Sequence, residues 1–251
     1  MTQQEKIHSS DNMSLFQRLH NELAQIIAET PAGERLKSEP ELAASLGVSR
    51  ATLREAMRSF EGQGMIRRRQ GVGTFVLDHH QNIDTGLEAL ESIEAQAKRL
   101  GIEVKMGYLG INRINADSDL AKEMVVTPGT EVVRISRVIW VEERPVAYLV
   151  DTVLNGILDN NDLTNGFTGS VLDLILKRGK PELSYSKTFI TAYPASSEIA
   201  KRMQLQRGDC LQKFDAYLYD ITDLMIDYSQ SYFVPGFFKF HINRSIPGAL
   251  N

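Results

Sequence analysis

Cysteine is almost absent from this chain of 251 residues, which holds one, Cys210. A single thiol excludes an internal disulfide and a cysteine-ligated metal cluster, so we expect Cys210 to be a packed residue. Long apolar runs are also missing, because no stretch approaches the ~20 apolar residues that a membrane-spanning helix needs. The N-terminal residues lack the apolar segment of a signal peptide. The sequence therefore predicts a cytoplasmic protein with no membrane partner.

Residues with catalytic or metal-binding spacing are missing as well. The sequence shows no clustered triad of His, Asp and Glu, no metal-ligand spacing and no glycine-rich phosphate loop. His79 and His80 are adjacent, but no third ligand is suggested nearby, and solvated linker residues are the simpler interpretation. We therefore expect no enzyme activity, no cofactor and no metal site.

Positive charge is present but unevenly distributed. Between Arg35 and Gly73 there are eight Lys or Arg residues and four acids, although the whole chain has a net charge of −4. The sequence pI of 5.8 averages this basic segment with an acidic remainder. A local basic segment of this kind is typical of proteins that bind nucleic acid. The length suffices for two domains with separate cores.

Residues 38–60 carry two short helical patterns joined by a tight turn. Ser38 and Glu41 have the spacing of a capping box, and Gly47 accepts the positive φ that ends the first helix. The second helix begins at the capping residue Ser49 and presents three polar residues, Arg50, Thr52 and Arg54, in its first turns. This layout is typical of a helix-turn-helix that reads the DNA major groove. Two amphipathic helices also occur in other folds, where these arginines would form a solvated face.

A glycine-rich hairpin pattern follows at residues 61–76 (EGQGMIRRRQGVGTFV). A β-hairpin after a helix-turn-helix is a wing, and its tip would hold Gln70, Gly71 and Gly73. Glycines let the backbone approach a phosphate or a groove wall. Before the two helices, apolar residues at helical spacing predict another helix over roughly 13–29, and the polar residues 1–12 are expected to be disordered.

Residues 15–76 resemble the winged helix-turn-helix of the GntR family of bacterial transcription regulators. The resemblance is carried by residues 33–36 (GERL), 38–39 (SE), 42–43 (LA), 46–54 (LGVSRATLR) and 70–76 (QGVGTFV). It implies that DNA is contacted by Arg50, Thr52, Arg54, Gln70 and Gly71, together with the adjoining Ser49 and Gly73. Lys37 replaces a usual proline and Pro40 replaces a basic residue that contacts DNA in many members. We expect Lys37 to supply affinity for phosphate instead.

The remainder of the chain predicts an α+β domain over residues 86–251, with the domain at 13–78 joined to it by a polar linker at 79–85. A helix is predicted over 86–100. Strand patterns then occur at 102–114, 131–141, 145–154, 184–193, 210–219 and 224–233, and short helical patterns at 117–124, 168–178 and 195–203. This mixture favours an antiparallel sheet with helices packed against it.

Two segments of this domain are similar to each other. Residues 119–124 (DLAKEM) precede Gly129, and residues 198–203 (EIAKRM) precede Gly208, at a constant offset of 79. Two copies of a helix–turn–strand–strand unit would form a pseudo-symmetric sheet with a cleft between them. A match this short also arises by chance.

Residues 86–244 resemble the UTRA effector-binding domain, so that the whole chain is similar to the HutC subfamily of GntR regulators. The resemblance is carried by residues 100–101, 121–130, 134–137 (RISR), 144–147 (RPVA), 169–170 and 238–240 (FKF). It implies a fold similar to chorismate lyase, with a ligand cleft and a dimer interface.

The resemblance also implies where an effector would bind. Many UTRA domains bind sugar phosphates or other small anions through arginines. Here Ile139 replaces one such arginine, and Val234, Gly236 and Phe237 replace a run of arginine, aspartate and arginine. These replacements predict an effector that is less phosphorylated or more apolar than in the sugar-phosphate members, or one that is bound by other groups. The expected lining residues are Arg134, Arg137, Asp151, Ser170, Ser229 and Tyr232, although an arginine on a strand is also commonly a surface ion pair.

The family resemblance implies a repressor that binds a palindromic operator as a homodimer and responds to a small-molecule effector. One alternative is a constitutive DNA-binding protein whose second domain only dimerises. A remote alternative is a lyase-like enzyme with a DNA-binding head, but similarity to the fold of a lyase carries no activity by itself.

Overall fold

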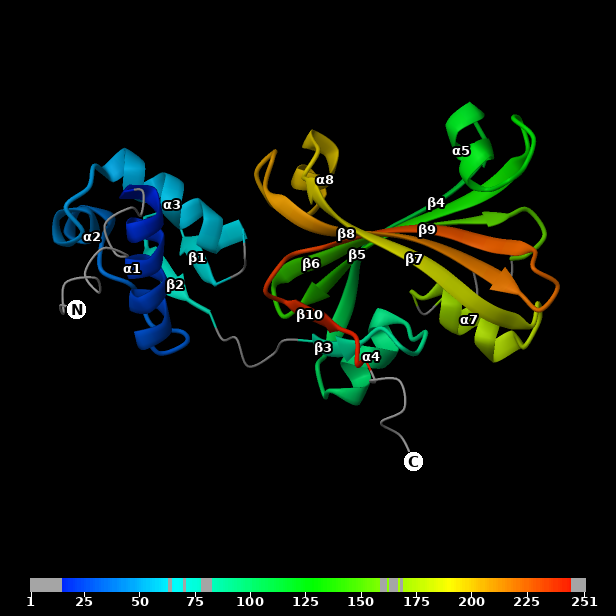
Figure 1. The fold of residues 1–251 in the computed structure, drawn as a ribbon, viewed down its shortest axis with the longest axis horizontal. Helices are drawn as coiled ribbons and strands as arrows, with labels where there is room; N and C mark the ends of the chain where they lie inside the picture. The colour runs from blue at the N-terminus through cyan, green and yellow to red at the C-terminus, as the bar shows by residue number, and fades with distance from the viewer. Residues whose placement is uncertain are drawn as a thin grey trace, which may run out of the picture. The chain divides into compact units, whose positions relative to one another are not determined.

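The computed structural model describes residues 15–62, 65–69, 71–77, 83–158, 162, 167 and 169–244. The chain divides into two compact units, Met1–His80 and Gln81–Asn251, each with its own hydrophobic core (Figure 1). The expectations for residues 1–12, Gln70, His79 and His80 fall outside the described residues. No helix in the described part of the chain is long and apolar enough to cross a membrane.

The N-terminal unit is a winged helix-turn-helix, as predicted. Its elements are α1 (Leu15–Glu29), α2 (Glu39–Ser45), α3 (Arg50–Gly62) and the antiparallel wing strands β1 (Ile66–Arg69) and β2 (Gly73–Val76). The core is built from apolar residues one turn apart on α1 and α3, namely Leu19, Leu23, Ile27, Leu53, Met57 and Phe60. The apolar side of α3 packs against α1 in this core, so the polar side of α3 is left exposed.

Local hydrogen bonds fix the start of α2 and the base of the wing. The Glu41 carboxylate accepts hydrogen bonds from the Ser38 backbone N–H at 2.9 Å and the Ser38 hydroxyl at 2.6 Å, and these bonds hold the pKa of Glu41 below its ordinary value. Gly47 adopts φ +65° where the chain reverses between α2 and α3. The backbone N–H of Leu36 donates to the Thr74 carbonyl at 2.8 Å, so the segment before α2 runs along β2.

The C-terminal unit contains a six-stranded antiparallel sheet in the order β4-β5-β6-β9-β8-β7. Its strands are β4 (Val104–Asn115), β5 (Glu131–Val141), β6 (Arg144–Leu154), β7 (Leu183–Pro194), β8 (Cys210–Asp220) and β9 (Met225–Phe233). All six were predicted within a few residues of these bounds, and the α+β fold is confirmed. Cys210 is exposed at the start of β8, so the expectation that it is packed was wrong.

Two expected boundaries were also wrong. The predicted linker 79–85 runs into strand β3 (Ile83–Gly86), which pairs in parallel with β10 (Phe238–His241) and buries Ile83 and Thr85. The helix predicted from residue 86 is α4 (Ile93–Arg99). It begins late because Ser92 caps it, its hydroxyl accepting from the Ala95 N–H at 2.9 Å.

The internal repeat is confirmed in the backbone. Helices α5 (Ser118–Glu123) and α8 (Ser197–Arg202) are capped by Asp117 and Ser196. Each helix is followed by a residue in the left-handed region, Val125 at φ 55° and Gln204 at φ 54°, and then by Gly129 at φ 89° and Gly208 at φ 90°. The two copies of the internal repeat therefore form the same helix–turn–strand structure in the two halves of the sheet.

The sheet has helices on both faces (Figure 1). One face packs against α5 and α8 and buries Val132 and Val138 of β5. The other packs against α4 and α7 (Val171–Arg178) and buries Val133, Ile135 and Ile139. We call these the α5/α8 face and the α4/α7 face. Because side chains alternate along a strand, neighbouring residues of β5 belong to different faces.

Candidate functional site

The exposed side of α3 begins with two hydroxyl residues that are bonded to each other. The Ser49 Oγ accepts a hydrogen bond from the Thr52 backbone N–H at 3.1 Å and lies 2.8 Å from the Thr52 Oγ1. Ser49 therefore serves as the cap of the helix. Arg50, the next residue, is exposed and forms no hydrogen bond or ion pair with any described residue. Its guanidinium is therefore available to an external group.

Arg54, one turn further along α3, is already paired. Its Nε donates to the Glu39 Oε2 at 2.7 Å, and the other oxygen of Glu39 lies 3.2 Å from the Nη2 of Arg68 on β1. The Glu39 carboxylate on α2 thus contacts both α3 and the wing strand β1. The Arg54 side chain is still 51% exposed, so a phosphate can replace Glu39 or share the guanidinium with it.

The wing tip combines exposure with packing. Gly71 is exposed at φ +75°, whereas Gly73 adopts φ +142° directly beneath the side chain of Arg35. The exposed Arg35 side chain could move away from an added Cβ, but L residues rarely adopt this φ, so the backbone conformation favours glycine here whether or not it contacts DNA. Lys37 is exposed just before α2. The described residues thus present several cations on one small domain.

The second candidate site is a cavity of about 540 Å³ on the α4/α7 face of the C-terminal unit. Its lining includes hydroxyl groups, from Ser170, Ser184, Ser186, Thr188, Ser229 and Ser231. It also includes apolar side chains, among them Leu149, Ile190, Phe214, Phe233 and Phe240. This volume and mixed lining are typical of a site for a small organic molecule.

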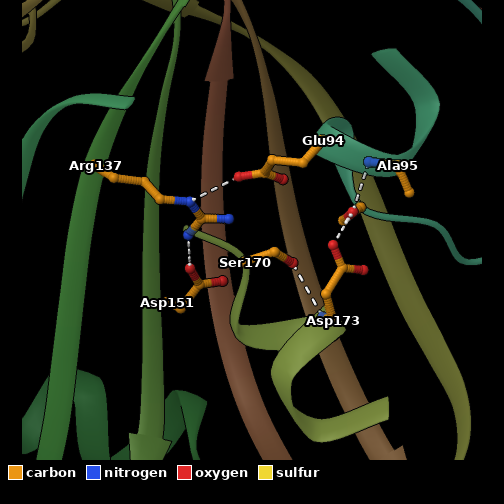
Figure 2. A network of polar contacts seen from close by, with 7 residues as sticks. Glu94, Ala95, Arg137, Asp151, Ser170 and Asp173 are labelled. Atoms are coloured by element: carbon orange, nitrogen blue, oxygen red, sulfur yellow. Dashed lines mark hydrogen bonds and ion pairs between the residues drawn. The ribbon is translucent and has the colours of Figure 1, made fainter. Parts of the chain in front are cut away.

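A buried ion network is formed around Arg137 (Figure 2), and Arg137 and Asp151 of this network line the cavity. The Arg137 side chain, from β5, is almost completely buried; its Nη1 donates to the Asp151 Oδ2 on β6, and its Nε donates to the Glu94 Oε1 on α4 at 3.4 Å. The hydroxyl of Ser92 donates to the Asp173 carboxylate at 2.7 Å and so links α4 to α7. The network therefore fixes both helices to the sheet around the cavity.

Burial changes the acidity of two carboxyl groups beside Arg137. Desolvation raises the pKa of Glu94, although Arg137 opposes this shift. Asp227 is fully buried on β9, and its pKa is raised well above the ordinary value, first by desolvation and then by the nearby charge of Asp151. The Asp227 Oδ1 accepts from the Thr152 N–H at 3.0 Å, which opposes the shift. Two carboxyl groups beside Arg137 thus protonate more readily than usual, and one of them, Asp227, lines the cavity.

Comparison with known families identifies both units. The profile of the bacterial regulatory proteins of the gntR family matches residues 14–76, and the UTRA domain profile matches residues 99–239. The chain belongs to the GntR family. Its C-terminal unit is a UTRA domain, as in the HutC-type regulators.

Individual relatives agree with this assignment. The HTH-type transcriptional regulator YurK of Bacillus subtilis is 24% identical over 210 residues, which cover 84% of this chain and 83% of YurK. The mannosyl-D-glycerate transport/metabolism system repressor MngR of Escherichia coli is 28% identical over 135 residues, 53% of this chain and 55% of MngR. The structure of PhnF from Mycobacterium smegmatis has the same fold, with a TM-score of 0.60, 20% identity, and coverage of 90% of this chain and 99% of PhnF. This GntR-family chain is a DNA-binding transcription regulator and not an enzyme.

The UTRA domain brings together four of the six residues predicted to line an effector site. Arg137, Asp151, Ser170 and Ser229 line the cavity on the α4/α7 face. Arg134 and Tyr232 do not. They lie three residues from Arg137 and Ser229, and an odd spacing along a strand places side chains on opposite faces. Tyr232 packs instead among the aromatic residues of the α5/α8 face.

The residues that replace the arginine–aspartate–arginine run do not line the cavity, so the expected class of effector stays a prediction. Val234 is buried in the core beneath α8, and Phe237 packs between that core and the one beneath α4. Neither of them, nor Gly236, lines the cavity. Their apolar character therefore says nothing about which ligand the cavity takes.

Sequence reasoning missed several lining residues of the UTRA domain. Asp227 and Ser231 flank Ser229 at a spacing of two, so strand alternation alone places all three on one face. The same rule groups Ser184, Ser186 and Thr188 on β7. Glu94 does not line the cavity but bonds Arg137, and it carried no such signal because its position depends on where Ser92 starts α4.

Proposed function

We propose that this protein is a cytoplasmic repressor that binds a palindromic operator as a homodimer and changes its DNA affinity when a small molecule occupies the UTRA cavity. The cavity with its buried ion network carries this proposal. Buried ion pairs contribute little to stability, and cavities lower it. A domain that served only to dimerise would gain stability from apolar side chains in this space.

At the DNA end, the proposal assigns base and phosphate contacts to Arg50, Thr52 and Arg54 and further phosphate contacts to Lys37. The wing tip, with Gln70, Gly71 and Gly73, would follow the adjoining groove. The guanidinium of Arg50 has no partner among the described residues, which supports a role in base recognition, whereas the pairing of Arg54 with Glu39 supports a phosphate contact that also orients the helix. Ser49 would act mainly as the helix cap.

Dimerisation is supported by the two edge strands of the sheet. The β4 strand exposes Met106, Tyr108, Leu109 and Ile111, and β7 exposes Phe189 and Ile190. Exposed apolar edge strands are prone to pair with another chain, and a second copy of the same chain is the commonest partner. A two-fold axis would match a palindromic operator with two recognition helices.

The test is operator binding with and without ligand. An operator is selected from random DNA by the full chain, and compounds that raise the melting temperature are then added to a fluorescence-anisotropy titration. The name of MngR, a repressor of mannosyl-D-glycerate transport and metabolism, makes carbohydrate derivatives the first compounds to screen.

A cavity-filling variant sharpens this test. Ser229→Phe should place a ring in the cavity, so that operator binding persists while the response to the ligand is lost. Ser197→Phe, at an exposed position of α8, is the matched control and should respond like the wild type. A full response in Ser229→Phe would contradict the placement of the effector.

A further inference from the structure

The charges around the cavity select a class of ligand, an inference that rests on the proposed function. Among the described residues that line the cavity, Arg137 is the one strong base, whereas Glu88, Glu91, Asp151 and Asp227 are acids. The guanidinium of Arg137 is already bonded to Asp151 and Glu94. An anionic ligand would have to separate these pairs and leave buried carboxylates without a partner, which is costly.

The buried hydrogen-bonding groups without a partner also favour a ligand that is not an anion. Gln96 lines the cavity with 5% of its surface exposed, and its Oε1 accepts no hydrogen bond within the described structure. Its Nε2 donates to the Glu91 carbonyl at 3.3 Å, which fixes the orientation of the amide. The Glu94 Oε2 is buried and unpartnered too. Both atoms are acceptors, and buried acceptors require a donor.

One backbone donor at the start of each helix beside the cavity is already bonded. The N-cap hydroxyl of Ser92 accepts from the Ala95 N–H at 2.9 Å, and that of Ser170 accepts from the Asp173 N–H at 3.1 Å. These two N–H groups are therefore satisfied within their own helices. The unpartnered Gln96 Oε1 is fixed as an acceptor, so its donor is expected to come from the ligand.

We propose that the cavity binds a hydroxylated organic amine, whose ammonium group donates to Gln96 and Asp227, both of which line the cavity. The hydroxyl groups of such a ligand would lie along the serines and threonine of β7 and β9, and its hydrocarbon part against Phe214 and Phe233. An ammonium carries several donors and no acceptor, which complements the unpartnered acceptors. Its positive charge also offsets the excess of carboxylates.

Three probes with one carbon skeleton test the charge preference. Glucamine is the amine derivative of sorbitol, sorbitol itself is neutral, and gluconate is the corresponding anion. Each is titrated into the full chain at equal ionic strength, and the melting temperature and the heat of binding are measured. We expect glucamine to raise the melting temperature by several degrees, sorbitol to raise it less and gluconate not at all. A larger shift with gluconate, or equal shifts with glucamine and sorbitol, would overturn the proposal.

Carboxamide variants locate the interaction. Asp227→Asn should weaken glucamine binding by about tenfold or more, the loss expected for one charge-assisted hydrogen bond. Glu94→Gln removes the negative charge that Glu94 places on the Arg137 guanidinium, so gluconate binding should increase in this variant. Glu103→Gln removes an exposed carboxylate before β4 and is the matched control. Unchanged glucamine affinity in Asp227→Asn would refute the assignment.

Two further outcomes separate this inference from the proposed function. If gluconate binds and alters operator affinity, the ligand class is wrong while the function stands. If glucamine binds as predicted and an ammonium-bearing ligand leaves operator affinity unchanged, the site stands while effector control is wrong.

Discussion

Arg50 and Arg54 lie one turn apart on the same exposed side of α3, yet their surroundings differ. Arg50 has no partner among the described residues, whereas Arg54 shares Glu39 with Arg68 of the wing. Removing Arg50 should therefore affect DNA binding alone, and removing Arg54 should also loosen the contact between α2 and α3. A comparison of the two variants therefore separates DNA recognition by Arg50 from the structural role of Arg54.

Arg50→Ala is expected to weaken operator binding by about 1–3 kcal/mol and to reduce discrimination against unrelated DNA, because a lost base contact removes specificity as well as affinity. Fluorescence anisotropy with operator and scrambled duplexes measures both quantities. Arg58→Ala, on the same helix and paired with Glu55 at 2.9 Å, is the control for simple loss of charge. Equal weakening on both duplexes would mean that Arg50 contacts phosphate only.

Asp227 makes a prediction about pH and stability. Its pKa is raised in the folded state by burial and by Asp151, with Arg137 opposing the shift. A carboxyl with a raised folded pKa favours folding when protonated, so the free energy of unfolding should fall as the pH rises from the unfolded value of about 4 through the folded value. Glu94 acts in the same direction.

Asp227→Asn should therefore unfold at a higher temperature than the wild type at pH 8, and the difference should shrink towards pH 5. Glu41, Glu88 and Asp220 have lowered pKa values, so their contribution to stability is lost only as the pH falls below about 4, outside this window. Calorimetry across the range provides the measurement. Parallel pH profiles for the two proteins would exclude Asp227 as the titrating group.

At the scale of single elements, local chemistry made most of the fold predictable. The strands were recognised from alternation, the repeat from its shared helix motif, and α2 from its capping box. The start of α4 was not predicted correctly, because Leu87 and Leu90 fit a helical stripe. The Leu87 N–H in fact donates to the His241 carbonyl and continues the β3–β10 pairing. That pairing joins residues far apart in sequence, which no local pattern reveals.

The candidate site was less predictable than the strands that carry it. Arg137 and Arg134 are alike in type, but the pleat of β5 sends them to opposite faces, and applying alternation to the site residues would have excluded Arg134. The position of Glu94 beside Arg137 depends on how α4 packs on the sheet, which is a property of the tertiary structure and not of the local sequence. Residue types were thus easier to predict than their grouping.

The repeated turns supply a prediction at this scale. Gly129→Ala and Gly208→Ala should each cost about 1 kcal/mol, because both glycines have φ near +90° and no atom lies within 4 Å of the place a Cβ would take, so backbone strain dominates. Val125→Gly should instead stabilise the protein, since a β-branched residue is strained at φ 55°. Thermal unfolding measures all three, and unequal costs for the two alanine variants would contradict their structural equivalence.

At the scale of the whole molecule, the proposed dimer predicts how the edge strands behave. Phe189→Asp on β7 and Ile111→Asp on β4 should each shift the protein towards monomer, because a buried unpaired carboxylate opposes association. Sedimentation velocity over a range of concentrations reports the change. Ile221→Asp, exposed in the β8–β9 turn, is the control. Dimers of unchanged stability in both edge variants would place the interface elsewhere.

The proposed function depends above all on control of DNA binding by occupancy of the UTRA cavity. The deciding quantity is the operator dissociation constant of the full chain, determined by anisotropy with and without a saturating concentration of the compound that most raises its melting temperature. We expect a change of at least about fivefold in the wild type, the lower end of usual allosteric couplings, and none in Ser229→Phe. The same dissociation constant for free and saturated wild-type protein would show that the cavity does not control DNA binding.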